Sequence, residues 1–210
     1  MNYLLVCDLD DTLTGDKNAI EKFNKIIKSK KFYLVYSSGR FKSSMISLIS
    51  MSGLVNPDAI IANLGTEIYF SPDWKIDKEW KQIVTKNWKK EKIVSTLEFF
   101  NLKPQPYEKK FVLPFFTDNE ALVKQIQKKI KSNNAKVVHT KNQFLDIIPN
   151  VAGKGNAARY LGNKLEMPII CCGDSENDRD MLKKSDYGIL VGNAPTHLKK
   201  EMKDQTNIYI

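Results

Sequence analysis

The chain has 210 residues, enough for one large domain or for one domain that carries an insert. Its composition, 42% hydrophobic and 27% charged, is that of an ordinary globular protein and excludes disordered and collagen-like classes. Apolar runs are too short for a membrane-spanning helix, and the net charge of +9 indicates an anionic partner such as a nucleic acid, a membrane surface or a phosphorylated substrate.

The first seventy residues alternate between strand and helix patterns. In chain order we expect a strand at 3–7, a helix at 18–29, a strand at 32–36, a helix from Phe41 that ends before Gly53, a strand at 59–62 and one arm of a hairpin at 67–70. Apolar side chains recur every three or four residues in both helices. Such alternation predicts a parallel sheet with helices on both faces.

The order of elements changes in the middle of the chain. Two lysine-rich helices within 74–100 precede a strand at 111–116, a helix at 119–132 and strands at 136–139 and 144–148. The alternation then resumes with a helix at 155–165, a strand at 169–172, a helix after Asp178, a strand at 188–191 and an extended piece at 208–210. We therefore predict an α/β fold, a Rossmann-like doubly wound parallel-sheet core (1–76 and 151–210) with an inserted α+β domain (77–150).

The positive charge is concentrated in this insert. Residues 77–150 contain 15 lysines, no arginine and eight acidic residues, so they carry +7 of the total of +9. Only three of the 33 basic residues in the chain are arginines. Because base-edge reading and bidentate phosphate clamps favour arginine, this composition argues against a nucleic-acid partner.

The cysteines and the first residues bear on the cellular compartment. Cys7, Cys171 and Cys172 are odd in number and lack the paired spacing of a zinc site or of a disulfide framework. The chain does not begin like a secretory signal. We expect a cytoplasmic protein with reduced thiols and no membrane partner.

Acidic residues follow two of the predicted strands. Asp8-Leu9-Asp10-Asp11-Thr12 follows the first strand, and Gly173-Asp174-Ser175-Glu176-Asn177-Asp178 follows a strand near the end of the chain. Either cluster alone would also fit an acidic turn that caps a helix. Open parallel sheets place ligand sites at the carboxyl ends of their strands, so the two clusters together predict one metal site. Carboxylate oxygens suit Mg²⁺.

Two further segments are typical of an anion site. Ser37-Ser38-Gly39-Arg40 ends the second strand and offers a hydroxyl, a backbone N–H and a guanidinium where a helix begins. Lys154, between Gly153 and Gly155, precedes another helix and supplies a point charge. A lone lysine is usually a solvated surface residue, so its position relative to the other segments decides its role.

These four segments in this order resemble the haloacid dehalogenase superfamily of phosphotransferases. Other stretches are similar to the sucrose-phosphate phosphatases and related sugar phosphatases within it, namely Gly15-Asp16, Gly65–Tyr69, Leu102–Gln105, Asp146 before Ile147–Pro149, and Lys154–Ala157. Members of this family usually continue beyond the last short strand, whereas this chain stops at Ile210. We expect this to affect packing at that sheet edge or oligomerisation.

The resemblance implies a role for each matching residue. Asp8 is expected to be the nucleophile that forms an aspartyl-phosphate, and Asp10 to be the general acid and base. Ser38 and Lys154 are expected to bind the transferring phosphoryl group, with help from Gly39, Arg40 and Asn177. The implied Mg²⁺ site consists of the Asp8 carboxylate, the Asp10 backbone carbonyl and Asp174, with Asp178 supporting the site and holding Lys154.

The resemblance also implies what the insert does. It would be a cap that closes over the active site and selects the substrate, with Glu67, Lys103 and Gln105 at the sugar pocket. Lys103 and Gln105 would equally fit surface positions beside two prolines. The expected protein is a monomeric Mg²⁺-dependent sugar-phosphate phosphatase of sucrose metabolism, with sucrose-6-phosphate or a related disaccharide phosphate as substrate.

Three alternatives remain open from the sequence. The same core would serve a phosphatase with broad specificity for small molecules. A phosphoacceptor switch also uses acidic residues, Ser or Thr and Lys around Mg²⁺, but its accepting Asp lies on a later strand and no insert interrupts it. A basic nucleic-acid-binding protein would explain the lysine excess and would lose its affinity as salt rises.

Overall fold

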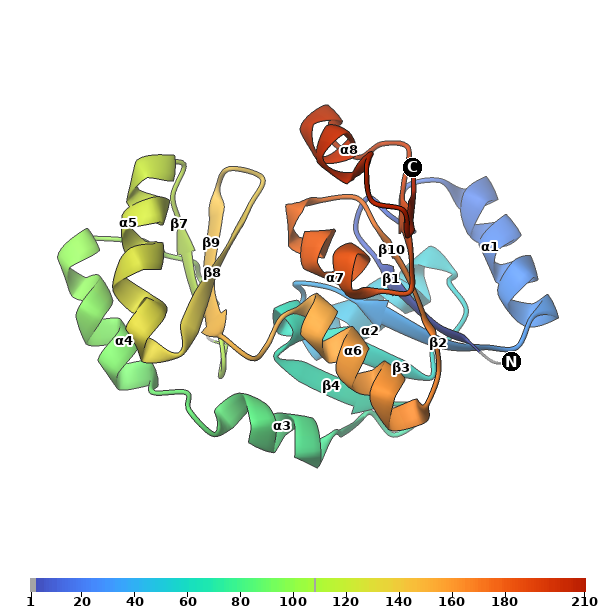
Figure 1. The fold of residues 1–210 in the computed structure, drawn as a ribbon. Helices are drawn as coiled ribbons and strands as arrows, with labels where there is room; N and C mark the ends of the chain where they lie inside the picture. Colours follow the sequence, from blue (N-terminus) through green and yellow to red (C-terminus); the bar gives the residue numbers. More distant parts are fainter. Residues whose placement is uncertain (1–2, 108) are drawn as a thin grey trace.

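The computed structural model describes residues 3–107 and 109–210, which fold into two lobes joined by α3 (Lys78–Thr85) and by the chain that leads into α6 (Lys154–Leu165) (Figure 1). An eight-stranded sheet forms the larger lobe, and its strand order is β12-β11-β10-β1-β2-β3-β4-β5. Its strands are β1 (Tyr3–Asp8), β2 (Phe32–Ser37), β3 (Ala59–Ala62), β4 (Glu67–Phe70), β5 (Lys75–Ile76), β10 (Ile169–Gly173), β11 (Tyr187–Leu190) and β12 (Ile208–Tyr209).

The central strands of this sheet are parallel and buried on both faces. β1 pairs in parallel with β2 on one side and with β10 on the other, and the antiparallel pairs are those that β4 makes with β3 and with β5. Leu4 and Val6 of β1 belong to one buried cluster, whereas Leu5 and Cys7 belong to another. This alternation follows from the two-residue period of a strand, and it explains why β1 is a continuous apolar run.

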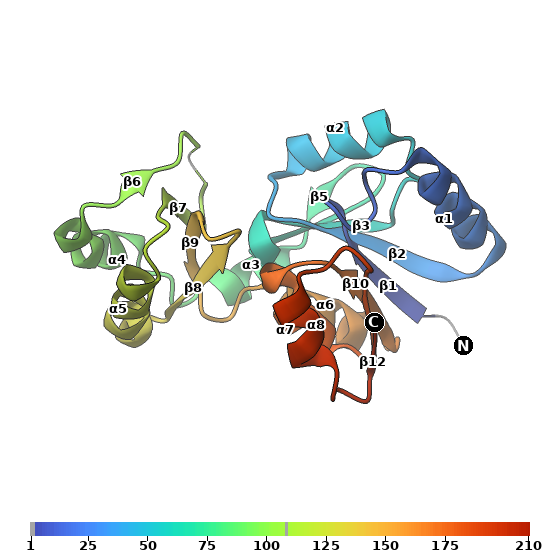
Figure 2. The ribbon, with the colours of Figure 1, turned by 90° about the horizontal axis from the view of Figure 1, so that it is seen from above.

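Helices cover the two faces of the larger sheet. One face carries α1 (Lys17–Ser29) and α2 (Lys42–Ser52), which contribute Ile20, Met45 and Ile49 to its core. The other face carries α3, α6, α7 (Arg179–Lys184) and α8 (Thr196–Met202). The view from above separates these two layers (Figure 2). The doubly wound α/β fold predicted from the sequence is therefore confirmed.

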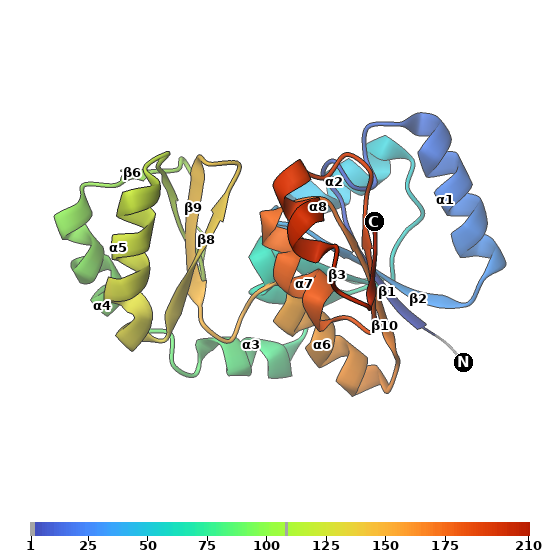
Figure 3. The ribbon, with the colours of Figure 1, turned by 45° about the horizontal axis from the view of Figure 1, so that its top comes forward.

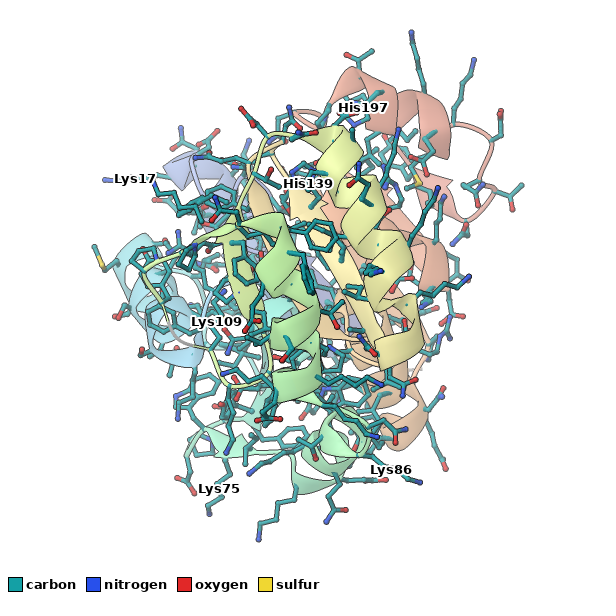
Figure 4. All side chains as sticks on the ribbon, turned by 90° about the vertical axis from the view of Figure 1, so that its left-hand side faces the viewer. Lys17, Lys75, Lys86, Lys109, His139 and His197 are labelled. Atoms are coloured by element: carbon teal, nitrogen blue, oxygen red, sulfur yellow. The ribbon has the colours of Figure 1, made fainter. Side chains whose placement is uncertain are left out.

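The smaller lobe is an antiparallel sheet with two helices on one face. Its strand order is β6-β7-β9-β8, and its helices α4 (Lys90–Leu97) and α5 (Glu120–Ile130) lie over the outer face (Figure 4). The strands are β6 (Lys103–Pro104), β7 (Leu113–Phe116), β8 (Ala135–Thr140) and β9 (Phe144–Pro149). Ile93, Ile126, Leu145 and Ile147 form a separate core with their neighbours.

Helix α3 packs on the larger lobe. Trp80 and Val84 are buried in the cluster that contains Leu4 and Val6, and the Trp80 indole nitrogen donates to the Gly65 carbonyl oxygen at 3.1 Å. Asp77 caps α3 and accepts hydrogen bonds from Tyr160 and Lys164 of α6. In Figure 3, α3 runs along the base of the molecule between the two lobes. The predicted boundaries of the insert, 77 and 150, stay a prediction.

The structure differs from the predicted elements in a few places. Helix α8 and the two-residue strands β5 and β6 were not predicted. Leu198 and Met202 are the buried, four-residue-spaced positions of α8, but a helix of seven residues gives too short a pattern to recognise. Cys7 and Cys171 are buried, Cys172 is partly buried, and all three are free thiols. No helix among the described residues has the length and apolar character needed to cross a membrane.

Candidate active site

The carboxyl ends of three neighbouring strands bring the predicted site residues together. Asp8 is the last residue of β1, Ser38 follows β2, and Asp174 follows β10. These strands are adjacent and parallel, so their ends meet at the same edge of the sheet. Asp8, Ser38 and Asp174 are all buried. The two acidic clusters and the serine turn thus form one site, as the sequence indicates.

Lys154 is the buried cation of this site. Its Nζ lies 2.5 Å from Asp8 Oδ1, 2.7 Å from Asp178 Oδ1 and 3.0 Å from Asn177 Oδ1. Lys154 is only 3% exposed, although lysine is rarely buried without partners. The two carboxylates supply these partners, so the flexible surface position that a lone lysine normally occupies is not found.

Two glycines allow Lys154 to reach the site. Gly153, which precedes α6, has a φ of 119°, and Gly65 has a φ of 82°. A Cβ on Gly65 would lie 2.2 Å from the carbonyl carbon of Gly153, so the two backbones can approach this closely only because residue 65 has no side chain. This close contact holds the first turn of α6 against the loop after β3.

Three carboxylates lie close enough to share a cation. Asp8, Asp174 and Asp178 each present an oxygen, and these oxygens are within 4.8 Å of one another. Asp178 Oδ2 already accepts from the backbone N–H groups of Asp174 and Ser175, so Asp178 is suited to support the site rather than to bind directly. Asp174 Oδ1 accepts from the Thr12 hydroxyl at 3.1 Å. The residues present therefore fit a hard divalent cation.

The charge balance of the site is visible in its pKa values. Burial, with the nearby charges of Asp178 and Asp174 adding to it, raises the pKa of Asp8 to about 8, and Lys154 opposes this rise. Burial and Asp178 raise the pKa of Asp174 to about 6. Burial favours the neutral form of Lys154, but Asp178 and Asp8 outweigh it and raise its pKa. The positive charge of Lys154 therefore does not balance the negative charge of the three carboxylates, and a bound cation would stabilise their ionised forms.

Asp10 is held by Arg40 at the mouth of the site. The Arg40 guanidinium donates to both Asp10 carboxylate oxygens, from Nε at 2.8 Å and from Nη2 at 2.8 Å. The Ser38 hydroxyl donates to Asp10 at 3.3 Å. Burial raises the pKa of Asp10, but the hydrogen bonds and charge of Arg40 outweigh burial and hold this pKa below its usual range.

A cavity of about 690 Å³ extends from these carboxylates to the smaller lobe. The larger lobe lines it with Asp8, Asp10, Asp11, Ser38, Gly39, Arg40, Phe41, Ser44, Leu64, Asp174, Ser175 and Asn177. The smaller lobe lines it with Gln105, Tyr107, Lys109, Thr140, Lys141, Phe144 and Asp146. A ligand in this cavity would therefore contact both lobes. The end of the cavity at Asp8 and Asp174 is acidic and buried, and the far wall mixes polar and aromatic side chains.

The predicted sugar-pocket residues do not all lie in this cavity. Gln105 lines it, and its Nε2 donates to the Phe115 carbonyl oxygen at 2.8 Å. Glu67 instead accepts from the Asn63 side chain, and Lys103 is exposed with its Nζ 5.9 Å from the centre of the Phe116 ring. In this structure Glu67 and Lys103 are not part of the cavity lining, and their sugar-binding role stays a prediction.

Several residues at the cavity were given no role from the sequence. Lys109, whose Nζ donates to the Gly39 carbonyl oxygen at 3.2 Å, is one of many lysines in its segment and has no distinguishing pattern (Figure 4). Lys141 belongs to the turn between β8 and β9. Asp146 could have been recognised as a lone carboxylate in the apolar strand β9. Thr12 belongs to the first acidic motif, and its place in that motif is the feature that could have identified it as a site residue.

The sequence and the fold match known proteins over the whole chain. A family model described as sucrose-6F-phosphate phosphohydrolase matches residues 1–210. A probable sucrose-phosphatase of Arabidopsis thaliana is 30% identical over 98% of this chain, and the chain spans about half of that relative's length, 55%. A mannosylfructose-phosphate phosphatase of Agrobacterium fabrum is 26% identical, with 91% of this chain and 83% of that protein covered.

Among solved structures, the sucrose-phosphatase of Synechocystis sp. PCC6803, in complex with sucrose and phosphate, superposes with a TM-score of 0.88. It is 27% identical, and the match covers 99% of this chain and 90% of that one. The agreement extends through both lobes, because nearly all of each chain is matched. With its aspartate, serine and lysine motifs gathered at one sheet edge, the chain belongs to the sucrose-6F-phosphate phosphohydrolase family of the haloacid dehalogenase superfamily.

Proposed function

We propose that this protein is a Mg²⁺-dependent phosphatase that hydrolyses a disaccharide phosphate, with sucrose-6-phosphate as the first candidate. The observation that carries the proposal is the buried Asp8 carboxylate, paired with Lys154 and facing Asp174 and Asp178 at the end of a large cavity. Relatives that are named for sucrose phosphate and for mannosylfructose phosphate support the substrate class.

The metal would be held by oxygen atoms at the sheet edge. Asp8 and Asp174 would bind through their carboxylates and Asp10 through its backbone carbonyl, with Asp178 as the supporting carboxylate. When bound, Mg²⁺ would neutralise this acidic cluster and withdraw charge from the phosphoryl oxygens. Asp8 would thereby be kept ionised at neutral pH, although without the metal burial and the neighbouring carboxylates raise its pKa to about 8 against the opposing charge of Lys154.

The first chemical step follows from the positions of Asp8 and Asp10. A carboxylate oxygen of Asp8 attacks phosphorus, the bond from phosphorus to the sugar oxygen breaks, and Asp10 gives its proton to that oxygen. Lys154 and Ser38 bind the phosphoryl oxygens, and the Asn177 amide nitrogen adds a donor because its Oδ1 is occupied by Lys154. The products of this step are the free sugar and a phosphorylated Asp8.

The second step releases phosphate. Asp10, now ionised, removes a proton from a water molecule whose oxygen attacks phosphorus, and the bond to Asp8 breaks. Inorganic phosphate leaves, and both aspartates return to their starting protonation states. The same carboxylate therefore acts as acid and then as base.

Arg40 links substrate binding to the protonation of Asp10. In the free protein Arg40 lowers the pKa of Asp10, which disfavours the protonated acid that the first step requires. An arriving phosphate dianion competes for the guanidinium, because Arg binds phosphate in the same bidentate manner as carboxylate. Release from Arg40 raises the pKa of Asp10 when the substrate is in place.

The smaller lobe would act as a cap that selects the sugar. The phosphoryl end of every phosphorylated sugar is alike, so discrimination depends on the wall that Gln105, Tyr107 and Asp146 contribute. Asp146 Oδ1 is buried without a hydrogen-bond partner among the described residues, and it would accept from a sugar hydroxyl. Residues 77–150 are the proposed extent of this cap.

The experiment is a panel of phosphorylated sugars assayed with Mg²⁺ for kcat/KM, with Asp8→Asn as the test variant. We expect the highest kcat/KM for a disaccharide phosphate and no measurable turnover by Asp8→Asn, whose circular dichroism should match the wild type. Equal rates across the panel would instead indicate a broad-specificity phosphatase. Turnover by Asp8→Asn at the wild-type rate would exclude the mechanism.

A further inference from the structure

The turn between β8 and β9 contacts the larger lobe through an ion pair. Lys141 Nζ lies 2.9 Å from Asp11 Oδ2, and the two residues are 130 positions apart in the chain. Both side chains are 58% exposed, so the pair lies at the rim of the cavity. In Figure 1 the gold loop that joins β8 and β9 lies on the side of the smaller lobe that faces the larger one.

This turn belongs to the wall that faces the catalytic carboxylates. Thr140, Lys141, Phe144 and Asp146 all line the cavity, and all come from β8, β9 or their turn. β9 is paired with β7 on one side and with β8 on the other, so these lining residues belong to one hydrogen-bonded sheet. A contact made by the turn is therefore connected through this sheet to the wall that faces Asp10.

Asp11, the other member of the ion pair, lies next to the phosphoryl site. Asp11 directly follows Asp10, and the Asn193 amide donates to the Asp11 carbonyl oxygen at 2.6 Å. Asp11 has a φ of 60°, in the left-handed region that glycine, asparagine and aspartate adopt more readily than other residues, and Lys141 has a φ of 52°, which is uncommon for lysine. Both backbones are thus held in uncommon conformations that direct the two side chains to one point.

We propose that Lys141 is a positioning residue, which pairs with Asp11 and thereby sets the distance between the sugar-facing wall and the phosphoryl site. Its kinetic consequence rests on the proposed phosphatase function. The lysine acts on KM for a phosphorylated sugar through Asp11, and it does not need to touch the phosphate. An exposed ion pair is weak, so the wall can also open to admit the substrate.

The competing explanation is that Lys141 attracts the phosphate directly. The two explanations predict opposite signs for Asp11→Asn. If Lys141 works by pairing with Asp11, removal of the Asp11 charge raises KM. If Lys141 works by attracting the substrate dianion, removal of a neighbouring negative charge lowers KM. Asparagine tolerates the positive φ of Asp11, so this variant preserves the local backbone.

The kinetic experiment measures KM and kcat of Lys141→Met, Asp11→Asn and the double variant with the best phosphorylated sugar of the panel. We expect each single variant to raise KM about two- to five-fold, the range expected for an exposed ion pair, with a smaller change in kcat. The double variant should be no worse than either single one. Lys141→Arg should restore the wild-type KM, and Lys128→Met, an exposed lysine of α5, measures the effect of losing one cap charge.

A lower KM for Asp11→Asn, or additive effects in the double variant, would overturn the proposal. A second measurement is independent of activity. Spin labels at Ser43→Cys of α2 and Ser95→Cys of α4, in a Cys172→Ser background, report the distance between the lobes. We expect Lys141→Met and Asp11→Asn to broaden this distance distribution and Lys128→Met to leave it unchanged.

An unchanged distribution in both variants would overturn the positioning role even if the enzyme is active. If the wild type hydrolyses no phosphorylated sugar, the proposed function fails, and the distance measurement alone decides whether the pair positions the wall.

Discussion

Asp146 is a buried carboxylate whose removal should stabilise the protein at high pH. It is 7% exposed in the middle of β9, between Pro114 of β7 and Val138 of β8. Its Oδ1 has no hydrogen-bond partner among the described residues. Burial raises its pKa from 3.8 to about 6, and the charge of Lys109 only partly opposes this. We therefore expect Asp146→Asn to be more stable than the wild type above pH 6.

The size of this stability change follows from the difference in the proton affinity of Asp146 between the folded and the unfolded protein. The folded protein binds the Asp146 proton more tightly than the unfolded chain, whose pKa is 3.8, so stability falls as pH rises through 3.8 to 6. The full loss is about 3 kcal/mol, at about 1.4 kcal/mol for each tenfold change in affinity. About half of it develops between pH 5 and pH 8. Asn carries no such charge, so this component disappears in the variant.

The assay is urea unfolding of metal-free wild type and Asp146→Asn at pH 5 and pH 8. The difference between the two proteins isolates Asp146, because Asp8 and Asp174 contribute alike to both. Asp118→Asn, an exposed position of the same lobe, is the matched control for the loss of one carboxylate. A stability difference between wild type and Asp146→Asn that does not grow from pH 5 to pH 8 would refute the reasoning. The same variant should raise KM for the sugar, because a sugar hydroxyl then donates to a neutral amide oxygen instead of a charged carboxylate, which is the stronger acceptor.

Three other outcomes are expected. Lys154→Met should destabilise the metal-free protein by about 3–5 kcal/mol in urea unfolding, because Asp8 and Asp178 lose their buried partner; a wild-type midpoint would contradict the ion-pair geometry. Arg40→Met should raise the pKa of Asp10 in a carboxyl NMR titration, since Arg40 is what holds it low, and an unchanged pKa would remove the proposed link to substrate binding. Joint replacement of Lys110, Lys124 and Lys131 by Gln should lower kcat/KM at low salt and leave kcat unchanged, because lysines of the smaller lobe attract the substrate dianion over a distance. The difference in kcat/KM between this variant and the wild type should vanish at about 1 M salt. A difference that persists at that salt concentration would exclude electrostatic steering.

Much of the fold was accessible from local patterns. The alternation of apolar strands with amphipathic helices predicts the doubly wound sheet, and the acidic motifs after β1 and β10 predict their meeting because parallel strand ends share an edge. Gly53 ends α2 in the left-handed conformation, as its place after the last apolar position indicates. These features depend on residues a few positions apart, or on one rule of sheet topology.

Local sequence patterns did not predict which charged side chains pair with one another. The sequence by itself determined the order of elements, the class of the fold and the residues at the strand ends, because periodicity and backbone preference act locally. Only the tertiary structure decided that Arg40 forms an ion pair with Asp10 and that Lys141 forms one with Asp11. It also decided that Glu67 and Lys103 do not line the cavity. Those outcomes depend on how distant segments pack together, and apart from Lys154, which lies in a recognisable glycine-flanked motif, the lysines carry no local pattern that tells which of them contact the site.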